Sequence, residues 1–416
     1  MKRFASIIMI CVLISMFSAV VLAKDLVIWD REKQTEDIVQ LFNAKLEAEG
    51  RKERVEFQLV PYEQQTQKFL AALAAGNAPD VISLDIILNP YFNSIGAFLD
   101  LSDRINALEY RTALPQGMLE LGAWDGHYYG IPYTVDLSGL VWNKELFREA
   151  GLDPEKPPTT WAELIEYGKL LTKDFDNDGN VDQYGFAIIG ASAGWQMFGF
   201  LPVVWSNGGS LLSDDGSEIM IDQPEAIEAL DFWVSLIHEH KIAPKNAATW
   251  QYADVYNSFI TGKAAMMLSG NFNIMTFKQD APDLEYGITY TPRGKGQHHS
   301  FSGGNLIAIS RDTKAPDLAW EFVEFSLSPE VQVEVWAKNG ALPVRSDLYD
   351  NEYFNAEPIY KVFADILKVG KAPFSTKYNE LYAPMLANMQ KAMMGTATAE
   401  QAYRDAAKEM RRVLAD

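Results

Sequence analysis

The organisation of the chain follows from one stretch, Gly130-Ile131-Pro132-Tyr133-Thr134-Val135-Asp136-Leu137-Ser138-Gly139-Leu140-Val141-Trp142-Asn143-Lys144-Glu145-Leu146-Phe147. It is a long β-prone run with a single acidic residue inside it, and it continues into a helix start. This pattern predicts a strand that leaves one lobe, crosses a cleft and begins a second lobe. A buried carboxylate needs a partner to offset its desolvation, so we expect Asp136 to face a protein group or a ligand at the crossing.

Length and composition predict a soluble protein of two globular units. The chain has 416 residues, which is long for one core. Its 48% apolar and 22% charged residues are typical of an ordinary globular protein. Without the basic pair Lys2 and Arg3, the formal net charge falls from -20 to -22, and such a surface disfavours nucleic acid and anionic membranes. We expect a freely soluble monomer.

Residues 1–23 have the pattern of a secretory signal peptide. A basic start precedes an uncharged run, and Val21-Leu22-Ala23 offers small or aliphatic residues for cleavage. A membrane anchor is the alternative, but the apolar run is short and lacks a stop-transfer flank. The only cysteine, Cys11, lies inside this segment and outside any lipoprotein cleavage context. The mature chain is therefore expected to be periplasmic and to contain no disulfide or Cys-ligated metal.

The mature chain opens with a βαβαβ pattern. Strands are predicted over 26–30, 55–60 and 80–85, with helices over about 34–49 and 64–75 between them. This order implies a mostly parallel sheet with helices on both faces, in which ligands bind at the carboxyl ends of the strands. Trp29, Arg31 and Asp85 fall at those ends. After the crossing, Thr160 and Glu163 form a predicted capping box for the next helix.

Several segments resemble, in the same order along the chain, the extracellular solute-binding proteins of sugar ABC importers, the maltose-binding-protein class. The segments are Gly76-Asn77-Ala78-Pro79-Asp80-Val81, the crossing at 131–147, 161–164, Asn207-Gly208-Gly209, 259–267, Gly303-Gly304-Asn305, Ala319-Trp320-Glu321-Phe322 and Gly340-Ala341-Leu342-Pro343. The resemblance implies an α/β fold of two lobes, the type II periplasmic-binding-protein fold, with a ligand cleft between them. It implies three hinge crossings, near 132–136, 292–297 and 340–349. The N-terminal lobe would comprise 24–133 plus about 297–343, and the C-terminal lobe 134–296 plus about 344–416.

The resemblance also implies the ligand-binding residues: Trp29, Arg31, Asp85, Asp136, Trp195, Gln196, Phe198, Asn271, Phe272, Gly303, Gly304, Asn305 and Tyr382. It places Trp195, Gln196 and Phe198 on a loop. The residue types fit sugar chemistry, because aromatic faces stack on sugar C–H groups and planar polar groups take adjacent hydroxyls. Phe272 and Tyr382 stand where tryptophan is usual, and the segment after Val81 lacks the tryptophan and acid-arginine pair of maltose binders. The expected ligand is therefore a mono-, di- or oligosaccharide, without maltose being indicated.

A second motif predicts a structural calcium ion. The run 174–182 matches the first nine positions of an EF-hand-type loop, with Asp174, Asp176, Asp178, Asn180 and Asp182 as candidate ligands. Position 12 is Gly185 instead of glutamate, so one ligand would have to come from elsewhere. The alternative is an acidic turn without an ion. No cofactor is predicted for function.

Two enzyme readings compete with a binding function. Gly190-Ala191-Ser192-Ala193-Gly194 matches the nucleophile-elbow pattern of serine hydrolases, although no oxyanion segment precedes it. Asp85 and Asp136 are the candidate pair for a glycosidase. A third alternative is a calcium-stabilised surface protein without a small ligand. We favour a non-enzymatic receptor that captures a sugar and presents it to the permease subunits of an ABC importer.

Overall fold

The structure of the chain is a computed structural model that describes residues 26–415, apart from the side chains of Glu63, Ala193, Trp195 and Asn379. The predicted signal peptide lies outside the described residues. Within them, no helix is long and apolar enough to cross a membrane. The strands are β1 Leu26–Asp30, β2 Val55–Leu59, β3 Val81–Asp85, β4 Ala123–Trp124, β5 His127–Tyr128, β6 Gly130–Asn143, β7 Met266–Gly270, β8 Tyr286–Thr289, β9 Ser300–Ile309 and β10 Gly370–Lys371.

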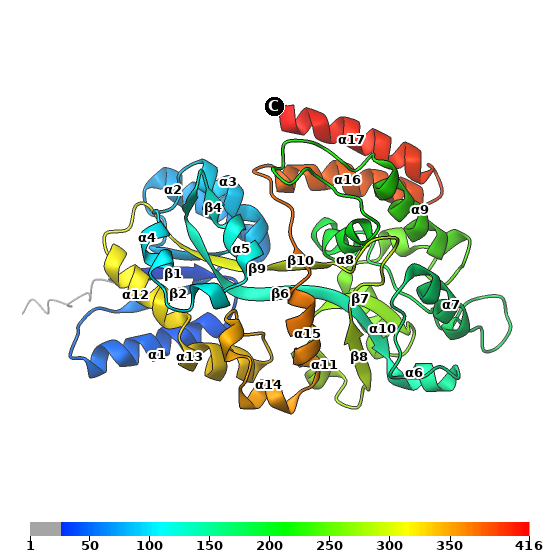
Figure 1. The fold of residues 1–416 in the computed structure, drawn as a ribbon, viewed down its shortest axis with the longest axis horizontal. Helices are drawn as coiled ribbons and strands as arrows, with labels where there is room; N and C mark the ends of the chain where they lie inside the picture. The colour runs from blue at the N-terminus through cyan, green and yellow to red at the C-terminus, as the bar shows by residue number, and fades with distance from the viewer. Residues whose placement is uncertain (1–25, 416) are drawn as a thin grey trace, which may run out of the picture.

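Helices occupy most of the remaining chain (Figure 1). The α-helices are α1 Gln34–Ala48, α2 Tyr62–Ala75, α3 Asn89–Ser94, α4 Ser102–Asn106, α5 Gln116–Leu121, α6 Lys144–Glu149, α7 Trp161–Leu171, α8 Ala193–Ser206, α9 Pro224–His238, α10 Tyr252–Ile260, α11 Asn273–Asp280, α12 Pro316–Ser326, α13 Pro329–Val331, α14 Glu352–Ala356, α15 Ile359–Leu367, α16 Tyr378–Met393 and α17 Ala399–Ala415. The 3-10 turns are η1 Ile86–Leu88, η2 Arg111–Ala113, η3 Ala247–Thr249, η5 Ala337–Asn339 and η6 Ser346–Leu348, and η4 Gln332–Trp336 is a π-helix.

The main sheet has the strand order β2-β1-β3-β9-β6-β7, with β8 and β10 attached to β6 and β9. The predicted βαβαβ opening is confirmed, because β1 pairs in parallel with both β2 and β3. The later strands β9 and β6 are antiparallel, so the sheet is mixed. The two-lobed α/β fold class is confirmed, and the carboxyl ends of β1 and β3 meet at one edge, as the strand order requires.

Strand β6 joins the two ends of the sheet. Its first half, Gly130–Leu137, runs antiparallel to β9, and its second half pairs with β7 and β8. Figure 1 shows β6 and β9 passing through the middle of the molecule, between a half built around β1 and β2 and a half built around α7 to α11. Asp136 lies on this shared strand. The exact lobe boundaries remain a prediction.

The second crossing was expected at 292–297, but β9 is the strand that runs beside β6. Segment 292–297 packs instead beside α8, where the Gly296 N–H donates to the Ser206 carbonyl oxygen (2.8 Å) and the Lys295 N–H to Asn207 Oδ1 (3.2 Å). The flexible glycines of this segment suggested a hinge. They instead permit close approach to the chain at 206–208, since a Cβ on Gly296 would lie 3.0 Å from the Ser206 carbonyl oxygen.

Local expectations were correct where capping or periodicity was strong. The capping box of Thr160 and Glu163 is present at the start of α7. The expected loop around Trp195, Gln196 and Phe198 is wrong, because these residues belong to helix α8. That helix contains Gly199 and Pro202 and is apolar on nearly every face, so it lacks the polar stripe that identifies a surface helix.

Candidate ligand-binding site

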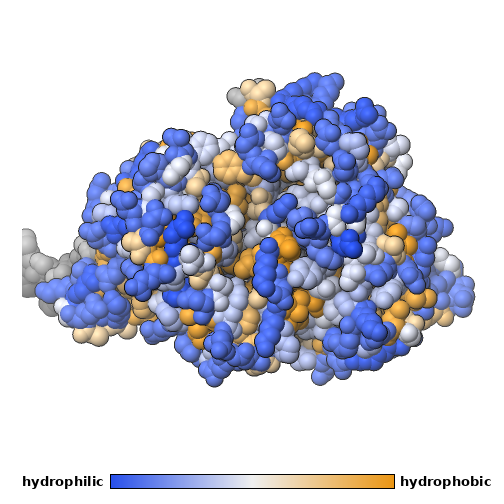
Figure 2. All heavy atoms as spheres, viewed as in Figure 1, coloured by the Kyte–Doolittle hydropathy of each residue, from blue (hydrophilic) through white to orange (hydrophobic). Residues whose placement is uncertain are grey.

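A cavity of about 610 Å³ lies where the ends of β1 and β3 meet β6, β9, α8, α11 and α16. Its volume is within the range of small-molecule sites. On the face shown in Figure 2, apolar residues gather in the middle of the molecule, between two mainly hydrophilic ends. The cavity is lined by Arg31, Glu32, Tyr62, Asp85, Ile87, Asp136, Ser192, Gly194, Phe198, Phe272, Phe301, Gly303, Gly304 and Tyr382.

Eight of the predicted ligand-binding residues lie on these walls. They come from seven elements or the turns beside them, and they are far apart in the sequence: Arg31, Asp85, Asp136, Phe198, Phe272, Gly303, Gly304 and Tyr382. The structure therefore brings together acids and aromatic residues from well-separated parts of the chain.

The polar wall is built around one guanidinium group. Arg31 Nη1 donates to Asp85 Oδ2 at 2.9 Å, and its Nε donates to Glu32 Oε1 at 3.1 Å. Asp136 Oδ2 lies farther away, 3.6 Å from Arg31 Nη2. Burial lowers the pKa of Arg31, but Asp85, Glu32 and Asp136 outweigh that effect and raise it overall. Arg31 therefore stays charged and holds the carboxylates in place.

Of the three acids on this wall, Asp136 lies farthest from the guanidinium group that offsets their negative charge. Burial raises its pKa to about 7; Arg31 opposes the rise, whereas Glu32 and Asp85 add to it. Its side chain is 28% exposed, compared with 17% for Asp85, and that exposed part faces the cavity. A carboxylate in this position is available to a ligand, which agrees with its predicted role.

A buried acid beneath the wall orients Arg31. Asp30 is fully buried, and its Oδ1 accepts the Arg31 N–H at 2.7 Å. Its Oδ2 accepts the Thr35 hydroxyl at 2.5 Å, and that hydroxyl is 3.0 Å from the Tyr133 hydroxyl on β6. Burial and Glu32 raise the pKa of Asp30 to about 7, although its bonds from Thr35 and the backbone oppose the rise. Asp30 thus links the turn after β1 to the shared strand.

The apolar wall is a group of aromatic rings. Phe198 packs against Phe272 and Phe301, with ring centroids 5.7 and 5.5 Å apart. Tyr62 and Tyr382 add rings that carry hydroxyl groups. Arg31 lies 5.6 Å from the centre of the Tyr62 ring, so the two walls meet at that residue. Such a site offers stacking faces on one side and hydrogen-bonding groups on the other.

Two predicted amide residues do not line the cavity. Asn271 Oδ1 accepts the Leu137 N–H at 2.7 Å, and its Nδ2 donates to the Val135 carbonyl at 2.9 Å. It therefore holds the backbone on both sides of Asp136. Asn305 is fully buried and lies opposite Asp85 in the β3–β9 ladder. Both were expected to bind ligand because amides suit hydroxyls. Asn271 instead binds backbone groups. The side-chain oxygen and nitrogen of Asn305 are buried without a hydrogen-bond partner among the described residues.

Trp29 and Gln196 are also placed away from the cavity walls. The Trp29 ring is 8% exposed and lies 4.4 Å from Lys68 Nζ, on the side of the sheet next to α2. Trp29 lies within β1, and alternation along the strand turns its side chain to the opposite face from Asp30. Gln196 is 2% exposed within α8. The side chain of Trp195 lies outside the described residues.

Several lining residues were not predicted from the sequence, chiefly Glu32, Tyr62 and Phe301. Glu32 follows Arg31 in the turn after β1, and Tyr62 begins the helix that follows β2. Phe301 stands two residues before Gly303 on β9, and therefore on the same face of the strand. That spacing was a usable signal, because Gly303 was already a candidate. Ile87 also lines the cavity and was not predicted. Ser192 and Gly194 line it as well, and the sequence had singled them out only as part of the nucleophile-elbow pattern.

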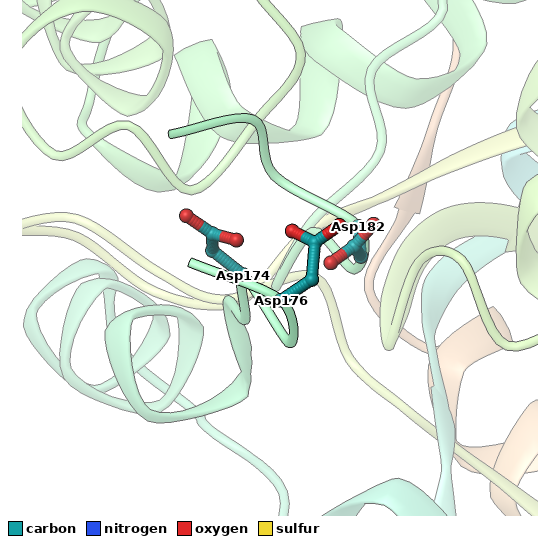
Figure 3. Close-up of side chains that lie close together, drawn as sticks. All are labelled: Asp174, Asp176 and Asp182. Carbon is teal, nitrogen blue, oxygen red and sulfur yellow. The ribbon is translucent and has the colours of Figure 1, made fainter. Parts of the chain in front are cut away.

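The acidic loop brings three of its five predicted metal ligands together. One carboxylate oxygen each from Asp174, Asp176 and Asp182 lie within 4.8 Å of one another (Figure 3). Asp178 instead accepts the N–H and the Nδ2 of Asn180, so these two residues satisfy each other. Position 12 admits no side chain, because a Cβ on Gly185 would lie 2.2 Å from the Gly168 carbonyl oxygen.

These features define a two-lobed receptor with a small-molecule cavity between its halves. The chain belongs to the bacterial extracellular solute-binding protein family, whose model matches residues 31–333. Members of this family bind substrates and are not enzymes.

The chain is similar to a binding protein of Brucella abortus, at 25% identity over 87% of this chain and 86% of the other. It is 27% identical to the arabinooligosaccharide-binding protein of Halalkalibacterium halodurans, over 73% of this chain and 67% of that one. In fold it is similar to an ABC transporter solute-binding protein from Thermotoga lettingae solved with α-D-tagatose. That match has a TM-score of 0.82 at 24% identity and covers 94% of this chain and 100% of the other.

Proposed function

We propose that this protein captures a carbohydrate in the cavity and delivers it to the membrane permease of an ABC importer. The observation that carries the proposal is the pairing of an aromatic wall, Phe198, Phe272 and Phe301, with the polar wall of Arg31, Asp85 and Asp136. A sugar ring presents an apolar face and a rim of hydroxyls, so it can satisfy both walls at once. The sugar-binding relative supports the same ligand class. A ligand that contacts both halves favours the arrangement in which the halves are closed around it.

Thermal unfolding against a sugar panel tests this proposal. The mature protein is unfolded and refolded to remove carried ligand, then scanned with monosaccharides, disaccharides, oligosaccharides, polyols and amino acids. A sugar at 100 times its dissociation constant should add about 2.7 kcal/mol of stability and raise Tm by several degrees. No shift with any sugar, from a protein that has refolded, would contradict the proposal. Amino acids serve as the matched negative panel.

We infer that the protein makes and breaks no bond. Ser192 lines the cavity at the start of α8, but none of the described lining residues is a histidine that could act as its base. Asp85 and Asp136 both lie beside the guanidinium of Arg31, and so on the same wall, whereas a glycosidase needs its two acids on opposite sides of the scissile bond. Release of nitrophenol from a chromogenic ester or glycoside, abolished by Ser192→Ala or Asp136→Ala, would overturn this inference.

We also propose that the protein is exported to the periplasm and acts there as a monomer. The basic start, apolar run and cleavage pattern of residues 1–23 support export to the periplasm. Mass spectrometry of the protein from its host tests this, because an acylated N-terminus, or an uncleaved one, would be incompatible with a free periplasmic receptor. Sedimentation of the mature protein tests the monomer.

We propose, in addition, that the acidic loop binds a structural Ca²⁺ ion through Asp174, Asp176 and Asp182. The cluster of carboxylate oxygens supports this, as does Asp174 Oδ1, which is buried without a hydrogen-bond partner. Gly179 adopts φ +87°, and its N–H donates to Asp174 Oδ2, so the loop turns as a cation-wrapping loop does.

Adding calcium should raise Tm, and removing it with EDTA should lower Tm. With the calcium concentration at 100 times its dissociation constant, the unfolding free energy should increase by about 2.7 kcal/mol. Mg²⁺ should act more weakly, because it demands a tighter octahedral shell. Asp176→Asn should abolish the calcium effect while leaving the sugar shift in place. If adding calcium leaves Tm unchanged, the loop does not bind a structural calcium ion.

A further inference from the structure

The charges that line the cavity are unbalanced. Arg31 is the only cation among the described lining residues, and it faces Glu32, Asp85 and Asp136. With all three acids ionised, the wall carries two more negative than positive charges. Unbalanced charge in a half-buried site is costly, since the low local dielectric strengthens repulsion and solvation is reduced.

The guanidinium group already faces three acids of the cavity wall. Its Nη1 and Nε atoms already donate to Asp85 and Glu32, at 2.9 and 3.1 Å. Its remaining nitrogen, Nη2, faces Asp136 at 3.6 Å. An arginine that receives a carboxylate or phosphate normally presents two free N–H groups in parallel. An anion at Arg31 would therefore compete with, and be repelled by, the three acids that already face the guanidinium group.

Asp136 is the acid that a ligand would meet. Its carboxylate makes no hydrogen bond in the described part of the chain, and its nearest cation is beyond hydrogen-bond distance. Asn271 fixes the backbone on both sides of it, through the Leu137 N–H and the Val135 carbonyl. The carboxylate is thus held in place with acceptor capacity directed at the cavity.

The aromatic residues that line the cavity provide a second feature that suits a cation, wherever a ring face meets the ligand. Phe198, Phe272 and Phe301 form one packed group, and Tyr62 and Tyr382 line the same cavity. The faces of aromatic rings carry partial negative charge and attract cations, more strongly where water is excluded. A neutral hydroxyl can donate to Asp136, but it leaves the excess negative charge unchanged. An ammonium group donates and also reduces that excess.

We propose that the cavity selects its carbohydrate by charge: it takes a sugar that carries a protonated amine, with the ammonium group against Asp136, and it excludes anionic sugars. This inference rests on the proposed capture of a carbohydrate. Charge selection predicts an order of affinity among sugars that differ at one substituent. The sugar with an amine should bind most tightly, the neutral sugar less tightly and the acidic sugar most weakly.

Isothermal titration calorimetry near neutral pH tests this order with matched sets. Each set comprises the amino sugar, the parent sugar, the N-acetylated amino sugar and the uronate, in the glucose, galactose and mannose series. Disaccharides such as deacetylated chitobiose, cellobiose and diacetylchitobiose extend the test. The amine should bind at least about tenfold more tightly than its neutral partners, which is about 1.4 kcal/mol, and the uronates should not bind. Added salt should weaken the binding of the amino sugar more than the binding of the neutral sugars.

Asp136→Asn should reduce the preference for the amine to less than about threefold, and Asp103→Asn, the same change on the exposed surface of α4, should preserve it. Thermal unfolding confirms that both variants are folded. If a neutral or N-acetylated sugar binds most tightly in its set, or if a uronate binds, charge selection is wrong while carbohydrate capture stands. If no sugar of any charge binds, the proposed function itself fails.

Discussion

Gly304→Ala should destabilise the protein by upward of about 3 kcal/mol, because it combines backbone strain with a steric clash. Gly304 has φ +109°, a conformation that residues with a Cβ rarely adopt. A Cβ at this position would lie 2.1 Å from the Thr134 carbonyl oxygen, at the place where β9 pairs with β6. Since both partners are backbone atoms of the shared strands, the clash can be relieved only by separating those strands. Thermal unfolding should show a fall in Tm of about 4 °C or more, or no soluble protein.

Gly303→Ala is the matched control for this prediction. A Cβ on Gly303 would meet Asp136 Cβ at 3.5 Å and the Phe301 ring at 3.6 Å, which are ordinary contact distances. Its stability should stay within about 1 kcal/mol of the natural protein. Its added methyl group lies at the cavity wall, so the loss should appear in ligand affinity instead. Equal destabilisation by the two substitutions would show that the volume of β9 residues, and not the conformation of Gly304, limits this crossing.

The sequence was informative about elements that have local signals. Strand β1 was predicted with its observed bounds, and the capping box placed the start of α7 at the observed residue. Helix α8 was missed because a helix buried on nearly all sides shows no amphipathic period. The π-helix η4 was missed for a different reason: its residues follow an ordinary helical pattern, and nothing in them distinguishes a π-turn from an α-turn. In the structure its Trp336 packs against Tyr133 on β6.

The site was predictable to the extent that strand ends determine it. Arg31 and Asp85 were identified because charged residues at such ends meet in one place, whereas Asp136 was identified as the single acid inside the predicted crossing strand. Asn271 shows where that reasoning stops, since the sequence cannot say whether an amide faces a ligand or the backbone. Only the register of β6 against β7, in which Ser138 pairs with Gly270, brings Asn271 beside Leu137 and gives it a structural role.

Asp136→Asn should stabilise the ligand-free protein at neutral pH while removing most of its ligand affinity. Burial raises the pKa of Asp136 from 3.8 to about 7, so the folded state holds a proton that the unfolded state has already released. The cost of ionising the buried acid therefore accumulates as pH rises from about 4 to 7, and it is absent below that window. Because the side chain is partly exposed, we expect a gain of about 1–2 kcal/mol for the variant above pH 7.

Chemical denaturation of ligand-free samples across this pH range provides the measurement. The two proteins should be equally stable near pH 3.5 and diverge as the pH rises, with the variant the more stable. Asp30 has its pKa raised in the same direction but is unchanged in both proteins, so the difference isolates Asp136. Loss of the 3.6 Å contact should cost little, because Arg31 keeps its shorter bonds to Asp85 and Glu32. If the variant is less stable at neutral pH, the attraction between Arg31 and Asp136 outweighs the desolvation of Asp136. The main role of Asp136 would then be structural.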